Sequence, residues 1–436
     1  MFTFILLAIL AVTVVLSIFR PWLGVCAYYV LAILSPQYIW PWIFGDIRAT
    51  LIVSVSVIAG LCFKVFADPS LLKRLKNTQI IFVMVIWAFT QLSNIFSPYV
   101  YGQDFSGIVP PHFIIDIFNT IVIFFILACL LIDSEKKLMF FTMVIIFSGL
   151  YLIFWANSAY LTGFMWKHQV DGRLMGPGGI YTDTNAFATL FVVVQPFLFY
   201  GAFIFRNRLF KSILWLSIPF LWHGIFLTGS RGGLLALFAM SCFMAFRMKS
   251  KRVGAALIVC LAIALITQGG QILDRTEKTI EKQESIAEGE KLDPRLESWR
   301  IGFEIIIDRP VFGVGPGRFQ VAAPNYDGSD SYVAHNTFLQ FSTGSGLGAG
   351  LLYLLLFWNE FKSKRRFCLH VHERVAINNI EFIHEAGVTA LIGFFVSSLF
   401  LDLMLFEPFY YLLALLVVTK AIKKHSSNEA SNLKDL

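Results

Sequence analysis

Long apolar runs separated by short polar or basic segments make up most of this chain. Most runs are about 15–20 residues long, close to the length that an α-helix needs to cross a bilayer. The alternation of apolar and polar residues that is typical of a transmembrane barrel does not accompany them. The pattern therefore predicts an all-α polytopic membrane protein with about 12–14 transmembrane helices. The runs are 2–19, 21–35, 50–66, 78–95, 113–132, 138–156, 186–205, 212–228, 232–246, 253–268, 336–358, 386–401 and 408–422.

Composition supports a membrane protein. Of the 436 residues, 57% are hydrophobic and only 14% are charged, which is more apolar surface than a soluble domain can bury. The six cysteines show no paired spacing, so we predict neither a disulfide nor a Cys-based metal site. Residues 2–19 lack a basic leader and a cleavage signal, and we expect them to stay as a membrane segment.

The net charge of +7 is concentrated in short loops between the apolar runs, so it indicates orientation and not nucleic-acid binding. The positive-inside rule predicts that these loops share the cytoplasmic side with the loop 359–385. If every run crosses once, the N-terminus lies on the opposite side; alternatively, one of the first two short runs is re-entrant. The basic segments are 73–76, 135–137, 206–211, 247–252, 362–366 and 423–425.

The remaining loops of this single integral membrane domain, 1–436, share the opposite face. They are 157–185, the turn 228–233 and the large loop 269–335. The large loop is predicted to hold a charged helix at 271–289 and a second helix that begins at Asp293-Pro294 and ends at Asp308.

The second loop helix carries an apolar stripe at helical spacing. Arg295 lies one turn before this stripe, so we predict that its side chain faces the membrane domain. The residues of the stripe are Trp299, Phe303, Ile306 and Ile307.

Arg231 lies among glycines in Gly229-Ser-Arg-Gly-Gly233, between two apolar runs. An arginine that snorkels toward the head groups, with glycines that permit close helix contact, is one explanation. However, short outer turns usually avoid Lys and Arg, and glycines let backbone N–H groups approach an anion. These two features favour anion binding by Arg231.

A loop rich in Gly and Pro, 171–185, leads into the apolar run 186–205. Asp183 and Asn185 are typical helix N-cap residues, whereas capping does not explain Arg173. The loop lacks the Lys-Ser/Thr ending of a P-loop, so the sequence gives no support for nucleotide hydrolysis.

His335 and Asn336 stand where the large polar loop meets the apolar run 336–358. Capping explains Asn336, and hydrogen bonds to backbone carbonyls could satisfy a lone interfacial histidine. The positive end of the following helix disfavours the imidazolium form, as do nearby arginines. A neutral His335 is therefore a candidate general base beside an anionic substrate.

Arg318 follows a second glycine-rich turn, 313–317, which returns the chain to the membrane surface. Anion binding and snorkelling are equal alternatives for this arginine.

Charge arguments alone thus place three arginines and one histidine on one face. The fixed fork of donors on arginine suits phosphate, which predicts a lipid pyrophosphate as ligand. Carboxylates on this face, including Asp402, show no ligand spacing, so no metal site is indicated. The four residues are Arg173, Arg231, Arg295 and His335.

Several blocks of the sequence resemble the O-antigen ligase/polymerase superfamily, in order and in spacing, over about residues 170–360. The Arg20–Gly24 and Ser35-Pro36 stretch resembles the ligase-like branch associated with exosortase systems. The blocks are Gly172-Arg173 with Asp183-Thr-Asn185, Ser230-Arg231-Gly-Gly, Arg295-x3-Trp299, Arg309 to Phe319, His335 to Leu339 and Gly344-x-Gly-Leu-Gly348.

The resemblance implies an inverting, metal-independent glycosyltransferase without a cofactor and with a GT-C-like helical fold. Such O-antigen ligases lie in the bacterial inner membrane. They transfer a glycan from undecaprenyl pyrophosphate to lipid A-core at the periplasmic face. By resemblance, His335 is the catalytic base, and Arg231 and Arg295 bind the pyrophosphate. The substrate-binding set is Arg173, Arg318, Asn185, Asn336 and Tyr332.

Alternatives within this class of function, and one different class, a transporter or flippase, remain open at this point. Within the same family, the chain could polymerise glycan repeats or glycosylate a protein, because the shared motifs do not identify the acceptor. A lipid-linked oligosaccharide flippase would need functional charges deep within spans and a path between the leaflets. The charges here cluster at one face, which favours an enzyme.

Overall fold

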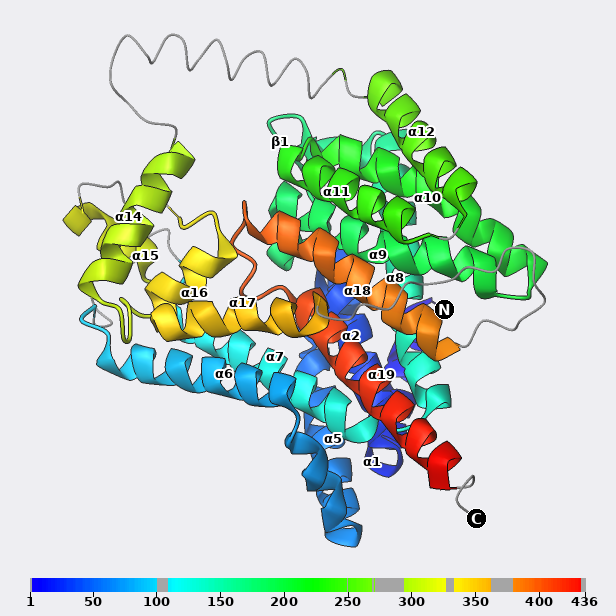
Figure 1. Cartoon of the computed structure of the whole chain (residues 1–436), viewed down its shortest axis with the longest axis horizontal. Helices are drawn as coiled ribbons and strands as arrows, with labels where there is room; N and C mark the ends of the chain where they lie inside the picture. Colours follow the sequence, from blue (N-terminus) through cyan, green and yellow to red (C-terminus); the bar gives the residue numbers. More distant parts are fainter. Residues whose placement is uncertain are drawn as a thin grey trace.

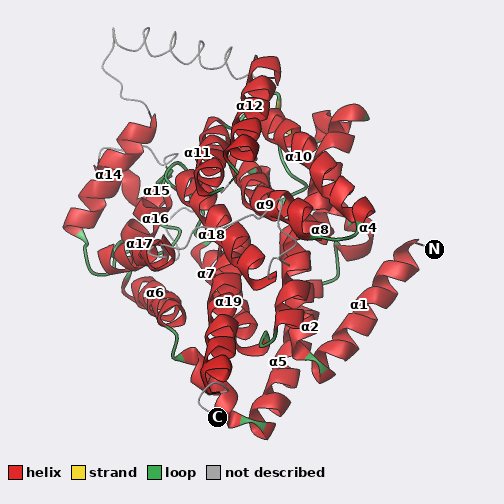
Figure 2. Ribbon diagram, turned by 45° about the vertical axis from the view of Figure 1, so that its right-hand side comes forward, coloured by secondary structure: helices red, strands yellow, loops and turns green. Residues whose placement is uncertain are grey.

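The structure is a computed structural model that describes residues 2–99, 109–248, 250–268, 270, 294–326, 333–361 and 379–432. Within these residues the chain is almost entirely helical (Figure 2), and the strands form one two-residue pair. The predicted all-α fold is confirmed. The predicted charged helix at 271–289 lies outside the described residues.

The helices up to the first strand pair are α1 (Phe2–Phe19), α2 (Pro21–Leu34), α3 (Pro36–Ile39), α4 (Pro41–Phe44), α5 (Ala49–Ala67), α6 (Thr78–Phe96), α7 (Pro111–Leu131) and α8 (Glu135–Leu161), with the 3-10 helices η1 (Pro69–Leu75) and η2 (Phe164–Lys167). The strands β1 (Gln169–Val170) and β2 (Arg173–Leu174) pair antiparallel, and η3 (Gly179–Thr182) follows. The later helices are α9 (Thr184–Ile204), α10 (Arg208–Thr228), α11 (Arg231–Arg247), α12 (Lys251–Gln268), α14 (Pro294–Asp308), α15 (Phe319–Ala322), η4 (Ala323–Tyr326), α16 (Thr337–Ser345), α17 (Leu347–Phe361), α18 (Asn379–Ser398) and α19 (Glu407–Asn432).

Seven helices among the described residues are long and apolar enough to cross a membrane. They are α5, α6, α7, α8, α9, α10 and α18, and α1, α2 and α17 are shorter apolar helices. The chain is therefore a multi-pass membrane protein. The apolar run expected at 336–358 is broken at Gly346, which separates α16 from α17.

The bundle is built around α9. Of the apolar stretch of α9, 89% is buried inside the protein, because α8, α10, α11 and α18 pack around it. At one side of the bundle, α1, α2 and α5 pack together, and at the other α6 packs against α16 and α17. Figures 1 and 2 show α14, α15 and α16 grouped at one end of the molecule.

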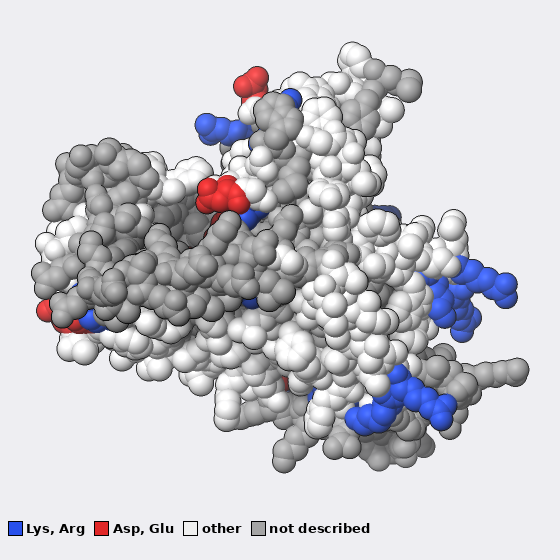
Figure 3. Space-filling model, turned by 90° about the horizontal axis from the view of Figure 1, so that it is seen from above, with Lys and Arg blue, Asp and Glu red and all other residues white. Residues whose placement is uncertain are grey.

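Basic helix ends meet at the opposite end of the bundle. Arg247 pairs with Glu385 at 2.5 Å, which joins the end of α11 to the start of α18. Lys420 of α19 pairs with Glu360 of α17 at 2.7 Å. In Figure 3, Lys and Arg side chains gather toward the right-hand edge, whereas most described atoms in the middle are uncharged. The common side of the basic loops stays a prediction, and the basic segment 362–366 lies outside the described residues.

The turn 313–317 packs against the break between α16 and α17, and two glycines allow this close contact. Gly313 and Gly346 both have positive φ, 64° and 91°, a conformation that glycine adopts without steric cost. A Cβ atom at Gly313 would lie 2.0 Å from the carbonyl oxygen of Thr343, and one at Gly346 would lie 2.0 Å from that of Val311. Close backbone approach therefore requires glycine at both positions.

α14 begins at Pro294 and ends at Asp308, as predicted, but its buried face differs from the predicted stripe. Ile301 and Ile305 are fully buried, whereas Phe303 and Ile307 are exposed. Ile306 is buried, as expected. The predicted stripe was therefore wrong for Phe303 and Ile307, because α14 is apolar on two faces and the face with the small residue Gly302 packs against α16.

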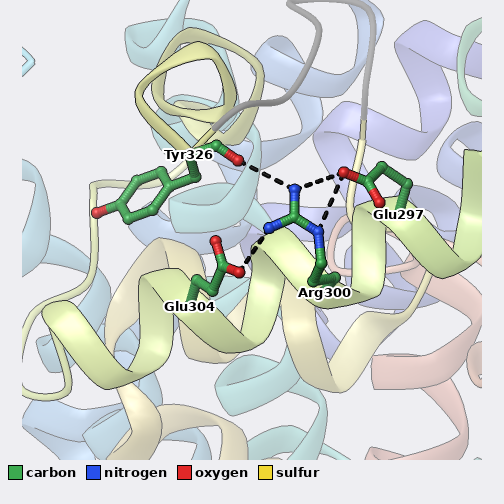
Figure 4. A network of polar contacts seen from close by, with 4 residues as sticks. All are labelled: Glu297, Arg300, Glu304 and Tyr326. Carbon is green, nitrogen blue, oxygen red and sulfur yellow. Dashed lines mark hydrogen bonds and ion pairs between the residues drawn. The ribbon is translucent and has the colours of Figure 1, made fainter.

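Arg300 of α14 forms a network of polar contacts that includes Tyr326 of η4 (Figure 4). Its guanidinium donates to Glu297 and Glu304 on α14 and to the carbonyl oxygen of Tyr326, the last at 3.2 Å. The hydrogen bond from Arg300 lowers the pKa of Glu297. The hydrogen bond from Arg300 to Tyr326 thus attaches α14 to η4.

Candidate functional site

The centre of the candidate site is the loop 399–406, which connects α18 to α19. Thr337 donates to the carbonyl oxygen of Leu401 at 2.6 Å and accepts from the N–H of Leu403 at 3.0 Å. The N–H of Met404 donates to the side chain of Gln340 at 3.1 Å. These bonds attach the loop 399–406 to the first turn of α16, directly after His335.

Asp402 holds the backbone of the predicted base. Its carboxylate accepts from the backbone N–H of His335 and from that of Asn336 at 3.2 Å. Asn336 caps α16 by accepting from the N–H of Leu339 at 3.1 Å, and its amide donates to the carbonyl oxygen of Leu399 at 3.0 Å. Capping by Asn336 was one of the sequence-based alternatives and is confirmed. Asp402, which the sequence left among scattered carboxylates, is the residue that sequence reasoning missed.

His335 has a left-handed backbone conformation, with φ of 49°. This conformation is uncommon for residues other than glycine and costs about 1–3 kcal/mol where the surroundings impose it. The hydrogen bonds that Asp402 accepts from the backbone and the cap at Asn336 lie on either side of this conformation and offset that cost. The position of the histidine is thus set by tertiary contacts.

Burial raises the pKa of Asp402 to about 7, and the nearby Asp183 carboxylate raises it as well, while the N–H groups of His335 and Asn336 oppose the shift. The segment before α9 packs against the loop 399–406. Phe406 of this loop contacts Tyr181, with ring centroids 6.4 Å apart.

The raised pKa of Asp402 predicts a pH-dependent contribution to stability. Its folded pKa, about 7, exceeds the reference value of 3.8. The folded state therefore binds the proton more tightly, and stability falls as the pH rises from about 4 to about 7. The Asp402→Asn variant has no carboxyl group to ionise at this position. We therefore expect the free energy of unfolding of this variant to fall by about 2–4 kcal/mol less than that of wild type over the same pH range.

Thermal unfolding in detergent between pH 4 and pH 8 measures the effect. Asp46→Asn, at an exposed aspartate on the segment before α5, is the matched control and should keep the wild-type slope. Parallel curves for wild type and Asp402→Asn would contradict the prediction.

Arg173 and Asn185 form a network with the turn before α11. Arg173 donates to the carbonyl oxygen of Thr228 and to the side-chain oxygen of Asn185, both at 2.9 Å. The same oxygen of Asn185 accepts from the hydroxyl of Ser230 at 2.8 Å. Asp183 is the N-cap of α9, as expected, whereas Asn185 lies inside the first turn. Asn185 therefore links β2, α9 and the 228–231 turn.

Arg231 is the first residue of α11, after the N-cap Ser230. The side chain of Ser230 accepts from the N–H of Gly233 at 3.0 Å, and Gly229 ends α10 with φ of 56°. Arg231 is exposed. A Cβ atom at Gly232 would lie 3.6 Å from the Cβ atom of Phe400. The Arg231 turn and His335 therefore contact the same loop, 399–406.

Arg295 lies in the first turn of α14 and is half-buried. It is one turn before the fully buried Ser298, on the face that contains Gly302. A Cβ atom at Gly302 would lie 3.3 Å from the side chain of Leu339 in α16. Ile306 of α14 packs in one cluster with Ala334 and Leu339. The helix that carries Arg295 thus packs beside His335.

Arg318 is almost fully buried, with 7% of its surface exposed. Its guanidinium donates to the carbonyl oxygen of Tyr99 at 3.0 Å, to the side chain of Asn94 at 2.8 Å and to the carbonyl oxygen of Pro316 at 3.4 Å. Burial lowers the pKa of Arg318. These contacts connect the turn 313–317 to the end of α6, and a role for Arg318 in binding substrate stays a prediction.

Two further expectations concern a substrate-binding tyrosine and metal binding. Tyr332, predicted to bind substrate, lies outside the described residues. In the part of the chain that the structure describes, no three His, Cys, Asp or Glu side chains come together as metal ligands would.

The geometry joins four elements at one end of the bundle. The loop 399–406 contacts the α11 turn, the start of α16 and the segment before α9, and α14 packs against α16. Arg173 is fixed by hydrogen bonds to the α11 turn. Arginines and a helix N-terminus together can hold an anion, and a histidine on a fixed backbone can accept a proton beside it.

Comparison with known proteins identifies a family for part of the chain. A family model described as O-antigen ligase matches residues 213–354. The matched segment includes Arg231, Arg295, Arg318 and His335, and it ends before Asp402. No curated protein matches the chain. The general function is therefore of the O-antigen ligase or polymerase type, a glycosyltransferase-like activity of a multi-pass membrane protein, and the match supports membership of the O-antigen ligase superfamily.

Proposed function

We propose that the protein is an O-antigen ligase that transfers a glycan from undecaprenyl pyrophosphate to lipid A-core oligosaccharide. The observation that carries the proposal is the loop 399–406, which contacts both the Arg231 turn and the backbone of His335. A base and an anion-binding arginine attached to one loop are suited to transfer from a phosphate leaving group.

The proposed reaction is a single displacement. The acceptor hydroxyl oxygen attacks the anomeric carbon, the bond from that carbon to the pyrophosphate oxygen breaks, and the configuration inverts. The hydroxyl proton passes to the neutral imidazole of His335. Negative charge that develops on the pyrophosphate is stabilised by Arg231 and Arg295, with Arg173 nearby in the network.

Orientation follows from the basic helix ends at the other end of the bundle. The positive-inside rule assigns those ends to the cytoplasm, so the site, with the segments 157–185 and 269–335, faces the periplasm of the inner membrane. In this assignment 359–385 is a cytoplasmic loop, of which residues 362–378 lie outside the described residues. The long lipid donor would then present its reacting carbon at the outer surface of the bilayer.

Purified protein in detergent, supplied with an undecaprenyl-pyrophosphate glycan and lipid A-core, tests the proposal. We expect glycosylated lipid A-core, with released undecaprenyl pyrophosphate, without nucleotide and in the presence of a metal chelator. Longer glycan on the donor lipid would instead identify a polymerase, and transfer to a protein acceptor would identify a protein glycosylase. No product from any of the three acceptors would contradict the proposal.

A further inference from the structure

α6 runs alongside α16 and α17 (Figure 1), and a stripe of polar side chains lies on one of its faces. Thr90, Ser93 and Asn94, with Ser97 directly after the helix, recur at intervals of three and four residues, so they share a face. Thr90 and Ser93 are fully buried. A buried hydroxyl is costly unless it forms a hydrogen bond, so these side chains need partners in neighbouring segments. The stripe lies outside the family-matched segment 213–354.

Two residues of the polar stripe contact the C-terminal end of α16. The hydroxyl of Ser93 donates to the carbonyl oxygen of Gly344 at 2.7 Å. The hydroxyl of Thr90 lies 3.0 Å from that of Ser345, the last residue of α16. The last four carbonyl groups of a helix have no partner within it, and Gly344 and Ser345 are both buried. Ser93 therefore supplies a hydrogen bond that this helix end lacks.

The rest of the stripe attaches the glycine-rich turn before α15 to the same helix end. Ser97 donates to the carbonyl oxygen of Val314 at 2.6 Å, and the backbone N–H of Val314 donates to the carbonyl oxygen of Thr343 at 2.8 Å. Asn94 accepts from the guanidinium of Arg318, at the end of the turn, at 2.8 Å. α6, this turn and the end of α16 therefore form one hydrogen-bonded unit.

α16 connects this unit to His335. The helix has nine residues, Thr337–Ser345, and at 1.5 Å per residue it is about 13 Å long. Its first residue, Thr337, is bonded to the loop 399–406, and His335 lies two residues before it. A short helix that is held at both ends moves as a rigid body, so a shift at its C-terminal end would also move His335. The contacts of α6 thus help to fix the place of His335.

We propose that α6 positions His335 through α16, and that Ser93 and Arg318 are positioning residues for the transfer reaction. The inference rests on the proposed function, because it concerns the place of the general base. In this assignment Ser93 holds the end of α16. Arg318 holds the turn beside it through hydrogen bonds to Asn94 and to the carbonyl oxygen of Tyr99, and it does not bind the donor. A displacement of about 1 Å between reacting groups costs about 10²-fold in rate, so this placement matters for catalysis.

Ser93→Ala removes the hydroxyl and tests the assignment. We expect kcat to fall by about 10–10²-fold, because His335 no longer lies at the right distance from the acceptor hydroxyl. Donor affinity should stay close to that of wild type, since Arg231 lies on α11. Ser217→Ala is the matched control. This buried serine donates within α10 to the carbonyl oxygen of Leu214 at 2.8 Å, and its replacement should leave kcat unchanged.

The His335→Gly variant distinguishes positioning of the base from a general loss of structure. Without a tethered imidazole there is no base for α16 to position, so Ser93→Ala should cause no further decrease in kcat in the His335→Gly background. Added free imidazole should restore the same share of activity in the single and the double variant. A decrease by the same factor in both backgrounds would overturn the inference.

Arg318→Met keeps the apolar stem of the side chain and loses the guanidinium. We expect the same pattern as for Ser93→Ala, a lower kcat with unchanged donor affinity. A rise in the Kd for undecaprenyl pyrophosphate would instead assign Arg318 to the anion and overturn its positioning role.

Hydrogen exchange reports without turnover whether α6 holds α16. The backbone N–H groups of α16 should exchange faster in Ser93→Ala than in wild type, and Ser217→Ala should match wild type. Thr90→Val keeps the shape of the side chain but removes the hydroxyl beside Ser345. It should change the exchange in the same direction, and it serves as the test if Ser93→Ala does not fold. Unchanged exchange of α16 in these variants would overturn the inference, whereas a wild-type protein without transfer activity would contradict the proposed function alone.

Discussion

Replacement of His335 by glycine is expected to lower the rate of transfer by about 10²–10⁴-fold, with little change in donor affinity. The substitution removes the imidazole that accepts the acceptor proton in the proposed reaction. It also suits the backbone, because residue 335 has φ of 49°, which glycine adopts freely. Loss of activity in a variant without added backbone strain would therefore report the missing base.

The measurement is single-turnover transfer with saturating donor, together with equilibrium binding of undecaprenyl pyrophosphate. Added imidazole should restore part of the activity of His335→Gly and none of the activity of a variant that has lost donor binding. His168→Ala is the matched control, since His168 lies on the loop before β1, against Trp155, and has no proposed role in transfer. Wild-type rates in His335→Gly would exclude His335 as the base.

Much of the helical structure of this protein could be predicted from the sequence, because it depends on local information. Apolar runs of membrane-spanning length, the Pro at the start of α14 and the Asn336 cap all appear in the structure. The break at Gly346 depends instead on the carbonyl oxygen of Val311, a contact with another segment. Hydrophobic periodicity gives no information about such a contact.

The face of α14 that packs inward could not be read from its apolar pattern alone. Phe303 and Ile307 lie at helical spacing but are exposed, while Ile301 and Ile305 are buried. Periodicity then identifies two possible faces without choosing between them.

The candidate site was predictable in part. Charge placement assigned Arg231 and His335 to one face of the membrane, and the structure attaches both to the loop 399–406. The role of Asp402 was not predictable, because its contact with His335 joins segments that are far apart in the chain and follows no local spacing. The contacts of Asn185 were not predictable for the same reason. Its position in the sequence suggested a helix cap, whereas its hydrogen bonds connect β2, α9 and the 228–231 turn.

Arg231→Ala is expected to lower kcat/KM for the donor by about 10²–10³-fold, the loss typical of removing one preorganised donor to developing charge. Arg231 is exposed at the start of α11, and the helix remains capped by Ser230. The substitution should therefore leave thermal stability close to that of wild type. Arg231→Lys keeps the charge but loses the forked donors, so we expect a smaller decrease.

Arg309→Ala provides the matched control for charge alone. Arg309 is also exposed in the same outer region, where it pairs with Asp308 at 3.3 Å. If Arg231 acted only by attracting anionic lipid through long-range charge, the two alanine variants would show similar decreases, and added salt would reduce both. If Arg231 binds the pyrophosphate directly, only Arg231→Ala loses activity, and the loss persists at high salt. Steady-state kinetics with donor and acceptor varied in turn, at low and high ionic strength, separates these mechanisms, because a direct contact changes the donor parameters and leaves the KM for the acceptor unchanged.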